Sequence, residues 1–262
     1  MTFDELIAAG RASNELVVPV TWSQGRATFG GLVTSLLFDR MERSIAESRP
    51  VRSVHVSFVG PVEAGVPAVF DAQILREGRS VTQVEGRIIQ NGEPRVVCLA
   101  AFAGDRESSV RIDGVPAPEA KPVGQCQELP YIEGMMPGFI NYIEMRWAYG
   151  SMPFTGGSGR EMGGWMRFRN VPEVLTDAHI VALIDAWPAP ILQHFKSRVP
   201  ASSLSWAFDI IHPRPALEAD DWLLYKATID QAGDGYCHFS ARVWTPRGEL
   251  LAISRQTATV FG

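Results

Sequence analysis

Two polar residues in the second half of the chain interrupt apolar patterns. Asp185 follows the apolar run from Ile180 to Ile184, and Gln256 lies in a strand-like stretch that also contains Ala258. A partly buried carboxyl group has a raised pKa and can act as a general base. A glutamine amide donates and accepts hydrogen bonds at once, so it can orient a water or a carbonyl group. The alternative interpretation is that both side chains face solvent.

Several other chemistries lack the residues they need. Ser203 is a candidate hydroxyl, but it has no neighbouring histidine and the chain contains no Gly-x-Ser-x-Gly elbow. Gly157-x-Gly159 does not complete a dinucleotide-binding fingerprint. The histidines show no metal-ligand spacing, and the three cysteines are far apart without a CxxC pair. We therefore expect buried free thiols and neither a metal nor a redox cofactor.

The chain contains an internal repeat. The segment 90–102 returns as 246–258, which pairs Gly92 with Gly248, 156 residues later. A duplicated fold brings two similar sheets and helices together, so a difference between the copies marks where a site survives in one of them. The largest difference is polar, because Gln256 stands where the first copy has Ala100. We expect one site per chain, assembled across the repeat.

Hydrophobic periodicity predicts the same layout in both copies, a helix associated with antiparallel strands. In the first copy the helix begins at Gly30 and ends near Ser48, and Asn91-Gly92 forms a type I′ hairpin turn. In the second copy Thr176 caps a helix that is broken at Pro188. The predicted strands cover residues 52–58, 68–75, 80–90, 95–102, 139–147, 162–169, 203–211, 222–229, 236–245 and 249–261.

The layout indicates an α+β fold with a pseudo-twofold axis, in which the two sheets pair through edge strands or flank each other closely. We assign residues 1–104 to the first repeat, 105–130 to a linker rich in proline, glycine and charge, and 131–262 to the second repeat. Exposed sheet edges also suggest a homo-oligomer.

Composition limits the class of protein. The 262 residues are 46% hydrophobic and 20% charged, with a formal net charge of −5. Lysine and arginine are scattered, which argues against nucleic acid as a partner. The N-terminus lacks a signal-peptide pattern, and no run approaches the ~18 apolar residues of a membrane span. We therefore expect a cytoplasmic protein.

Five motifs of the chain resemble one known family in the same order. They are Phe-Gly-Gly-Leu-Val at 29–33, His-Val-Ser-Phe at 55–58, Arg-Glu-Gly-Arg-Ser at 76–80, Trp-Leu-Leu-Tyr at 222–225, and Gly-Glu-Leu-Leu-Ala-Ile-Ser-Arg-Gln at 248–256. The family is that of the acyl-CoA thioesterase II, or TesB-like, thioesterases. The resemblance covers essentially the whole chain. It implies a double hot-dog fold, two tandem repeats that each wrap a curved antiparallel sheet around a central helix.

The resemblance also implies a catalytic group. In the family an Asp, a Thr or Ser, and a Gln together hold the attacking water, and these fall on Asp185, Ser203 and Gln256. Ser202 and Ser205 are alternatives for the hydroxyl. The family usually continues from the Thr with Ile-Asp-His, whereas this chain has Leu-Ser-Trp at 204–206. The hydroxyl is kept, and the departure bears on the geometry and the substrate range.

Five further residues are candidates for binding the substrate. Gly30 and Gly31 would expose backbone N–H groups at a helix start, where the helix dipole favours negative charge. His55, on the polar face of its strand, is a candidate for lining the acyl or pantetheine channel. Arg79 and Ser80 follow a glycine turn and are candidates for contacting CoA phosphates. The alternatives are turn glycines, a structural histidine and a solvated turn.

The resemblance implies that the protein is an enzyme that hydrolyses fatty acyl-CoA to a free fatty acid and CoA. A thiol leaving group with a pKa near ~8.5 needs little acid assistance, so a positioned water, a base and a stabilised oxyanion suffice. One alternative is a non-catalytic acyl-CoA-binding protein. Another is an enoyl-CoA hydratase on the same fold; such hydratases resemble one another in an Asp and a His about five residues apart on the central helix segment, and Asp185 has no histidine at that spacing.

Overall fold

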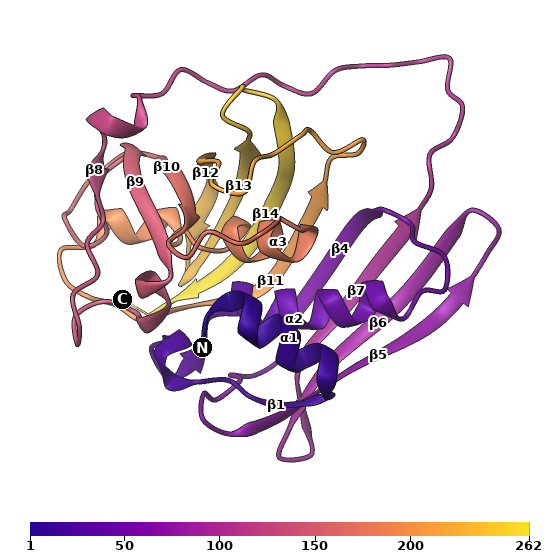
Figure 1. Ribbon diagram of the computed structural model, residues 1–262. Coiled ribbons are helices and arrows are strands. Elements are labelled where there is room, and N and C mark those ends of the chain that lie inside the picture. Colours follow the sequence, from indigo (N-terminus) through magenta and orange to yellow (C-terminus); the bar gives the residue numbers. More distant parts are fainter. Residues whose placement is uncertain (262) are drawn as a thin grey trace.

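Two helices, α2 (Gly30–Arg43) and α3 (Asp177–Ile184), pack against each other on the inner face of one curved sheet (Figure 1). The structure is a computed structural model that describes residues 1–261, so only Gly262 of the predicted second repeat lies outside the described residues. Residues of both helices contribute to one continuous apolar core. The α+β double hot-dog fold is confirmed.

The large sheet has 12 strands. In spatial order they are β1 (Glu15–Val17), β5 (Pro67–Glu77), β6 (Val81–Gln90), β7 (Glu93–Ala103), β4 (Val51–Phe58), β11 (Ala201–Ile210), β14 (Leu250–Val260), β13 (Tyr236–Trp244), β12 (Leu223–Gly233), β10 (Glu161–Phe168), β9 (Ile143–Tyr149) and β8 (Gln127–Glu128). The remaining elements are α1 (Phe3–Ala12), the small pair β2 (Ser23–Gln24) and β3 (Ala27–Thr28), and short 3₁₀ helices at Val20–Trp22, Val123–Gln125, Gly138–Asn141 and Pro190–His194.

The order of the central strands, from β5 to β12, is symmetric about the middle of the sheet. Strands β5, β6, β7 and β4 of the first copy correspond to β12, β13, β14 and β11 of the second, in mirrored order. The copies join where β4 and β11 pair antiparallel, with Val56 opposite Trp206. The pseudo-twofold axis therefore passes between these two strands, and the expected pairing of the sheets through edge strands is confirmed.

Irregularities in the sheet recur at equivalent places in the two copies. The register shifts between Val51 and Ser53 in β4, and between Ser203 and Ser205 in β11. The outer strands match in the same way, with shifts between residues 74 and 76 in β5 and between 229 and 231 in β12. A β-bulge adds a residue at a defined position. These matching bulges align Val51 with Ser203.

The same register places Ala100 and Gln256 at equivalent positions in the two copies. Ala100 in β7 lies opposite Val54 on one side and Val84 on the other. Gln256 in β14 lies opposite Trp206 and Phe239, which belong to the corresponding strands of the second copy. The alignment of the repeats inferred from the sequence is thus confirmed, and the first copy carries apolar side chains at both positions, Val51 and Ala100.

Three elements differ from the predictions. Helix α2 ends at Arg43, not near Ser48, and the hydroxyl of Ser44 then donates to the Met41 carbonyl. The strand predicted from residue 139 begins at residue 143, because a 3₁₀ helix follows Pro137 and stacks Phe139 on Phe29. Helix α1 was not predicted, although Thr2 and Glu5 form a capping box at its start.

The connector between the copies lies along the outside of the second copy (Figure 1). Two indole N–H groups hold it, since Trp244 donates to the Val115 carbonyl at 2.8 Å and Trp165 donates to the Lys121 carbonyl at 2.8 Å. The three cysteines are buried and unpaired, as predicted.

Candidate active site

Asp185 occupies the position immediately after α3, where the helix gives way to an irregular turn. The helix cannot resume after this turn, because Pro188 follows and restricts the residue before it to extended backbone. The carboxylate faces the first turn of α2, where the backbone N–H of Gly31 donates to it. Asp185 therefore lies at the contact between the helices of the two copies.

Asp185, Gln256 and Ser203 form one chain of hydrogen bonds. The amide nitrogen Nε2 of Gln256 donates to Oδ1 of Asp185 at 2.9 Å. The hydroxyl of Ser203 donates to Oε1 of the same glutamine, also at 2.9 Å. Gln256 is 5% exposed, so water cannot supply hydrogen bonds to its amide. Asp185 and Ser203 supply them instead. The three residues taken as catalytic candidates are thus brought together.

The bulge in β11 selects which serine joins this group. With one extra residue at position 204, Ser203 and Trp206 share the inner face of the sheet, although they are three residues apart. Ser205 is exposed and lies opposite Ser57 of β4. Ser202 is exposed as well, and its carbonyl accepts a hydrogen bond from Thr259. Of the three possible hydroxyls, Ser203 is the one that contacts Gln256.

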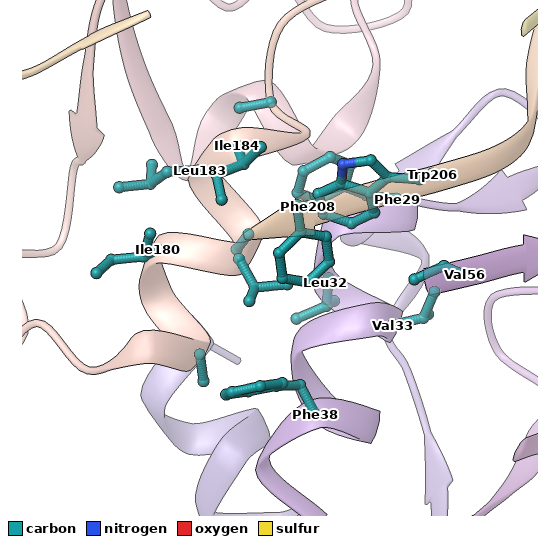
Figure 2. Packing of buried hydrophobic residues seen from close by; sticks show 14 of the residues in the cluster. Phe29, Leu32, Val33, Phe38, Val56, Ile180, Leu183, Ile184, Trp206 and Phe208 are labelled. Carbon is teal, nitrogen blue, oxygen red and sulfur yellow. The ribbon is translucent and has the colours of Figure 1, made fainter. Parts of the chain in front are cut away.

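The surroundings of Asp185 favour its neutral form. Burial raises the pKa of Asp185 from the ordinary 3.8 to about 7, while the hydrogen bonds from Gln256 and Gly31 oppose this change. Apolar side chains from both helices and from β11 fill the adjoining core, including Leu32, Ile184 and Trp206 (Figure 2). A carboxyl group with a pKa near neutrality can both accept and return a proton at physiological pH.

The two glycines at the start of α2 have different surroundings. A Cβ atom on Gly30 would lie 2.9 Å from Oδ2 of Asp185, so the absence of a side chain gives the carboxylate its place. A Cβ atom on Gly31 would lie 2.4 Å from the Phe29 ring and 2.8 Å from the carbonyl oxygen of Ala182. Gly30 therefore makes room for Asp185, and Gly31 permits close packing of the two helices.

His55 lies on the opposite face of the sheet from Asp185. Its neighbours Val54 and Val56 point into the core, so alternation directs His55 to the outer face, where it is exposed. There it lines a cavity of about 330 Å³ together with Ser57 and Arg255. Gln256 also lines this cavity, but its side chain bonds Ser203 and Asp185 on the inner face, so the His55 side chain is not brought to that hydrogen-bonded group.

Arg79 and Ser80 lie at the far end of α2 from Asp185. They line a separate cavity of about 310 Å³ with Arg49 and Arg106, formed partly by the segment that follows α2. Asp185 contacts the first turn of that helix, and 14 helical residues span about 21 Å. These two residues are therefore also not brought to the catalytic candidates.

Two aromatic residues near Asp185 were not singled out from the sequence. Trp187 follows two residues later, and its ring stacks on Tyr225 with the centroids 5.7 Å apart. Burial and the nearby charge of Asp185 raise the pKa of the Tyr225 phenol above its ordinary value. Tyr225 belongs to the Trp-Leu-Leu-Tyr motif, and its inward direction in β12 is the signal that could have identified it.

Two absences hold for residues 1–261. This part of the chain contains no group of three His, Cys, Asp or Glu side chains that could hold a metal ion. Within the same residues, no helix has both the length and the apolar character needed to cross a membrane.

Models of known protein families match both halves of the chain. The acyl-CoA thioesterase N-terminal domain matches residues 18–103, and the acyl-CoA thioesterase C-terminal domain matches residues 118–260. The chain belongs to the acyl-CoA thioesterase family. This is a family of thioester hydrolases, and the resemblance inferred from the five motifs is confirmed.

Individual relatives agree with this membership. Human acyl-coenzyme A thioesterase 8 is 26% identical over 102 residues, a match that covers 37% of this chain and 32% of the human protein, about a third of its length. A hot-dog-fold protein from Alicyclobacillus acidocaldarius superposes with a TM-score of 0.82 at 20% identity, covering 95% of this chain and 92% of the other. The acyl-CoA thioesterase II TesB2 from Mycobacterium marinum gives 0.75 at 21% identity, covering 95% and 93%. The two structures share the fold of this chain.

Proposed function

We propose that this member of the family hydrolyses the thioester of fatty acyl-CoA by direct attack of water, with Asp185 as the general base. The observation that carries the proposal is the chain of hydrogen bonds from Ser203 through Gln256 to Asp185. It ends at a carboxyl group whose pKa is raised to about 7. Family membership supplies the class of substrate.

In this mechanism the oxygen of the water bonds to the thioester carbon, and ionised Asp185 accepts a proton from that water. Gln256 and Ser203 orient the water and the carboxylate, and they are themselves held by their mutual hydrogen bond. Backbone N–H groups in the first turn of α2 would stabilise the negative oxygen of the tetrahedral intermediate, because the dipole of the helix favours negative charge there.

The intermediate then collapses with cleavage of the carbon–sulfur bond. The leaving thiolate of CoA takes the proton held by Asp185, which returns the carboxylate to its starting state. A thiol pKa of about 8.5 makes thiolate a good leaving group without a second acid. The apolar residues beside the site suit the hydrocarbon part of a fatty acyl group (Figure 2).

Release of free thiol from acyl-CoAs of increasing chain length tests the proposal. The parent should release CoA, and Asp185→Asn should lose roughly 10²- to 10⁴-fold in kcat, the usual contribution of a general base. Asp209→Asn is the matched control, since Asp209 lies in the same strand as Ser203 but opposite Ile253, outside the hydrogen-bonded group. Equal turnover by Asp185→Asn and the parent would exclude the proposed base.

The same assay addresses the non-catalytic alternative. If the chain binds acyl-CoA in a calorimetric titration but releases no thiol at any chain length, it is a binding protein. In that case the hydrogen-bonded group of Ser203, Gln256 and Asp185 would have a structural role only.

A further inference from the structure

The position of Asp185 depends on what anchors the turn that follows α3. Asp185 lies beyond the last helical residue, so regular backbone hydrogen bonding of the helix does not fix it on its C-terminal side. Two residues later, Trp187 is 5% exposed and is followed by Pro188. One backbone hydrogen bond, from the Ala186 N–H to the Leu183 carbonyl at 3.1 Å, closes the turn locally, and the buried indole ring connects it to the sheet.

The sheet provides a place for this ring at Gly164. In β10, Gly164 lies opposite Trp147 of β9 on one side and Tyr225 of β12 on the other. Strands two apart in a sheet are about 9.6 Å from each other, and no side chain stands between the two aromatic residues. The Trp187 ring lies 4.7 Å from that of Trp147 and 5.7 Å from that of Tyr225, measured between centroids. Trp187 thus fills the gap above the glycine.

The backbone requires a glycine at this point. A Cβ atom on Gly164 would lie 1.9 Å from the carbonyl oxygen of Arg146, and the register of β9 and β10 shifts between Gly163 and Gly164. Because only glycine fits at position 164, no side chain from β10 can occupy the gap between Trp147 and Tyr225.

We infer that Trp187 is a positioning residue for Asp185, an inference that rests on the proposed function. Its ring, held between Trp147 and Tyr225, fixes the turn so that the carboxylate stays against Gly31 and Gln256 and away from bulk water. Tyr225 connects the two groups, because it stacks parallel to Trp187, with an angle of 1° between the rings, and interacts with the charge of Asp185.

The ring, and not its N–H group, carries this role. Within residues 1–261, the buried indole nitrogens of Trp147 and Trp187 have no hydrogen-bond partner. Four other indoles each donate to an acceptor, namely those of Trp22, Trp165, Trp206 and Trp244. Replacing Trp187 with phenylalanine therefore removes no hydrogen bond and keeps an aromatic ring between its two neighbours.

The test compares Trp187→Leu and Trp187→Phe with the parent. In Trp187→Leu we expect kcat for acyl-CoA hydrolysis to fall roughly 10- to 100-fold with little change in KM, as for a small misplacement of a reacting group. We also expect the pKa of Asp185, measured by carbon NMR of its carboxyl group, to fall because water reaches it. Trp187→Phe should stay close to the parent in both measurements.

Trp244→Leu is the matched control, since Trp244 is an equally buried indole that packs in a separate cluster with Leu224 and Leu250. It should lower the melting temperature without moving the pKa of Asp185. If Trp187→Leu does not fold, Trp147→Leu removes the aromatic ring that packs on the other side of Trp187. It should also lower the pKa of Asp185.

Three results would overturn the inference. They are an unchanged pKa of Asp185 in a folded Trp187→Leu or Trp147→Leu protein, an equal effect of Trp244→Leu, or a loss in Trp187→Phe as large as in Trp187→Leu. Absence of thiol release by the parent would instead refute the proposed function, and the NMR titration would still report whether Trp187 positions Asp185.

Discussion

Replacing Asp185 with asparagine should make the folded protein more stable at alkaline pH, even though it removes the proposed base. Burial raises the pKa of Asp185 from 3.8 to about 7, so the folded state binds this proton more tightly than the unfolded state does. Between these two values the folded state carries more protons, and the free energy of unfolding of the parent therefore falls as pH rises.

The separation between 3.8 and about 7 corresponds to about 4 kcal/mol of lost stability once the pH exceeds both values. Asp185 keeps partial contact with solvent, and an asparagine amide adds a donor near the donors that now serve the carboxylate. Because both effects reduce the gain, we expect Asp185→Asn to gain about 2 to 4 kcal/mol at pH 8. At pH 4 most of the gain should be gone, and well below pH 3.8 it should vanish, because Asp185 is then protonated in the folded and unfolded states alike.

Thermal unfolding of both proteins at pH 4 and pH 8 measures this difference. In a chain of this size each kcal/mol shifts Tm by about 2–4 °C, so a gain of roughly 10 °C is expected at pH 8. Asp71→Asn serves as the control, because Asp71 is an exposed carboxylate on β5. A gain of equal size at both pH values, or a loss at pH 8, would refute the argument that burial holds Asp185 in its neutral form.

The remaining predictions concern activity and, for the two glycines of α2, thermal stability. The rate of thiol release should rise with pH through a midpoint near 7, because the ionised form of Asp185 is the base; a rate that falls over this range would contradict that role. Gln256→Ala, which copies Ala100 of the first repeat, should cost roughly 10²- to 10³-fold in kcat and move the midpoint upward, since the Gln256 hydrogen bond lowers the pKa of Asp185. Gly30→Ala should lower kcat with little change in Tm, because its Cβ atom displaces the carboxylate. Gly31→Ala should instead lower Tm, because its Cβ atom meets the backbone of α3; similar effects of the two substitutions would contradict the different roles assigned to them.

Regular secondary structure was largely predictable because its signals are local. The alternation of apolar residues placed most strands within a few residues, and Asn91 and Gly92 both have the positive φ angles that a type I′ turn requires. Errors arose where packing between distant segments decides the backbone. The 3₁₀ helix at Gly138–Asn141 places Phe139 on Phe29, more than a hundred residues away in the chain, and no local pattern contains that contact.

The substrate-binding candidates show the same difference between what local sequence patterns predict and what packing between distant segments decides. Alternation already placed His55 opposite Val54 and Val56, so its outward direction follows from the sequence. The remoteness of Arg79 from Asp185 does not follow in this way, because it depends on the direction of α2 across the sheet and on which end of that helix meets α3. Proximity between segments far apart in the chain is a property of the packed layers.

The sequence by itself determined the duplication, the double hot-dog class and the mismatch of Ala100 with Gln256, since each is written in residue types and their spacing. Only the tertiary structure decided that Ser203, and not Ser202 or Ser205, contacts Gln256, because a bulge in β11 sets which serine faces inward. It also decided that Trp187 fills the gap above Gly164. Strand register and helix packing arise from contacts between distant segments, and these bring the polar group of the second copy to the helix start of the first.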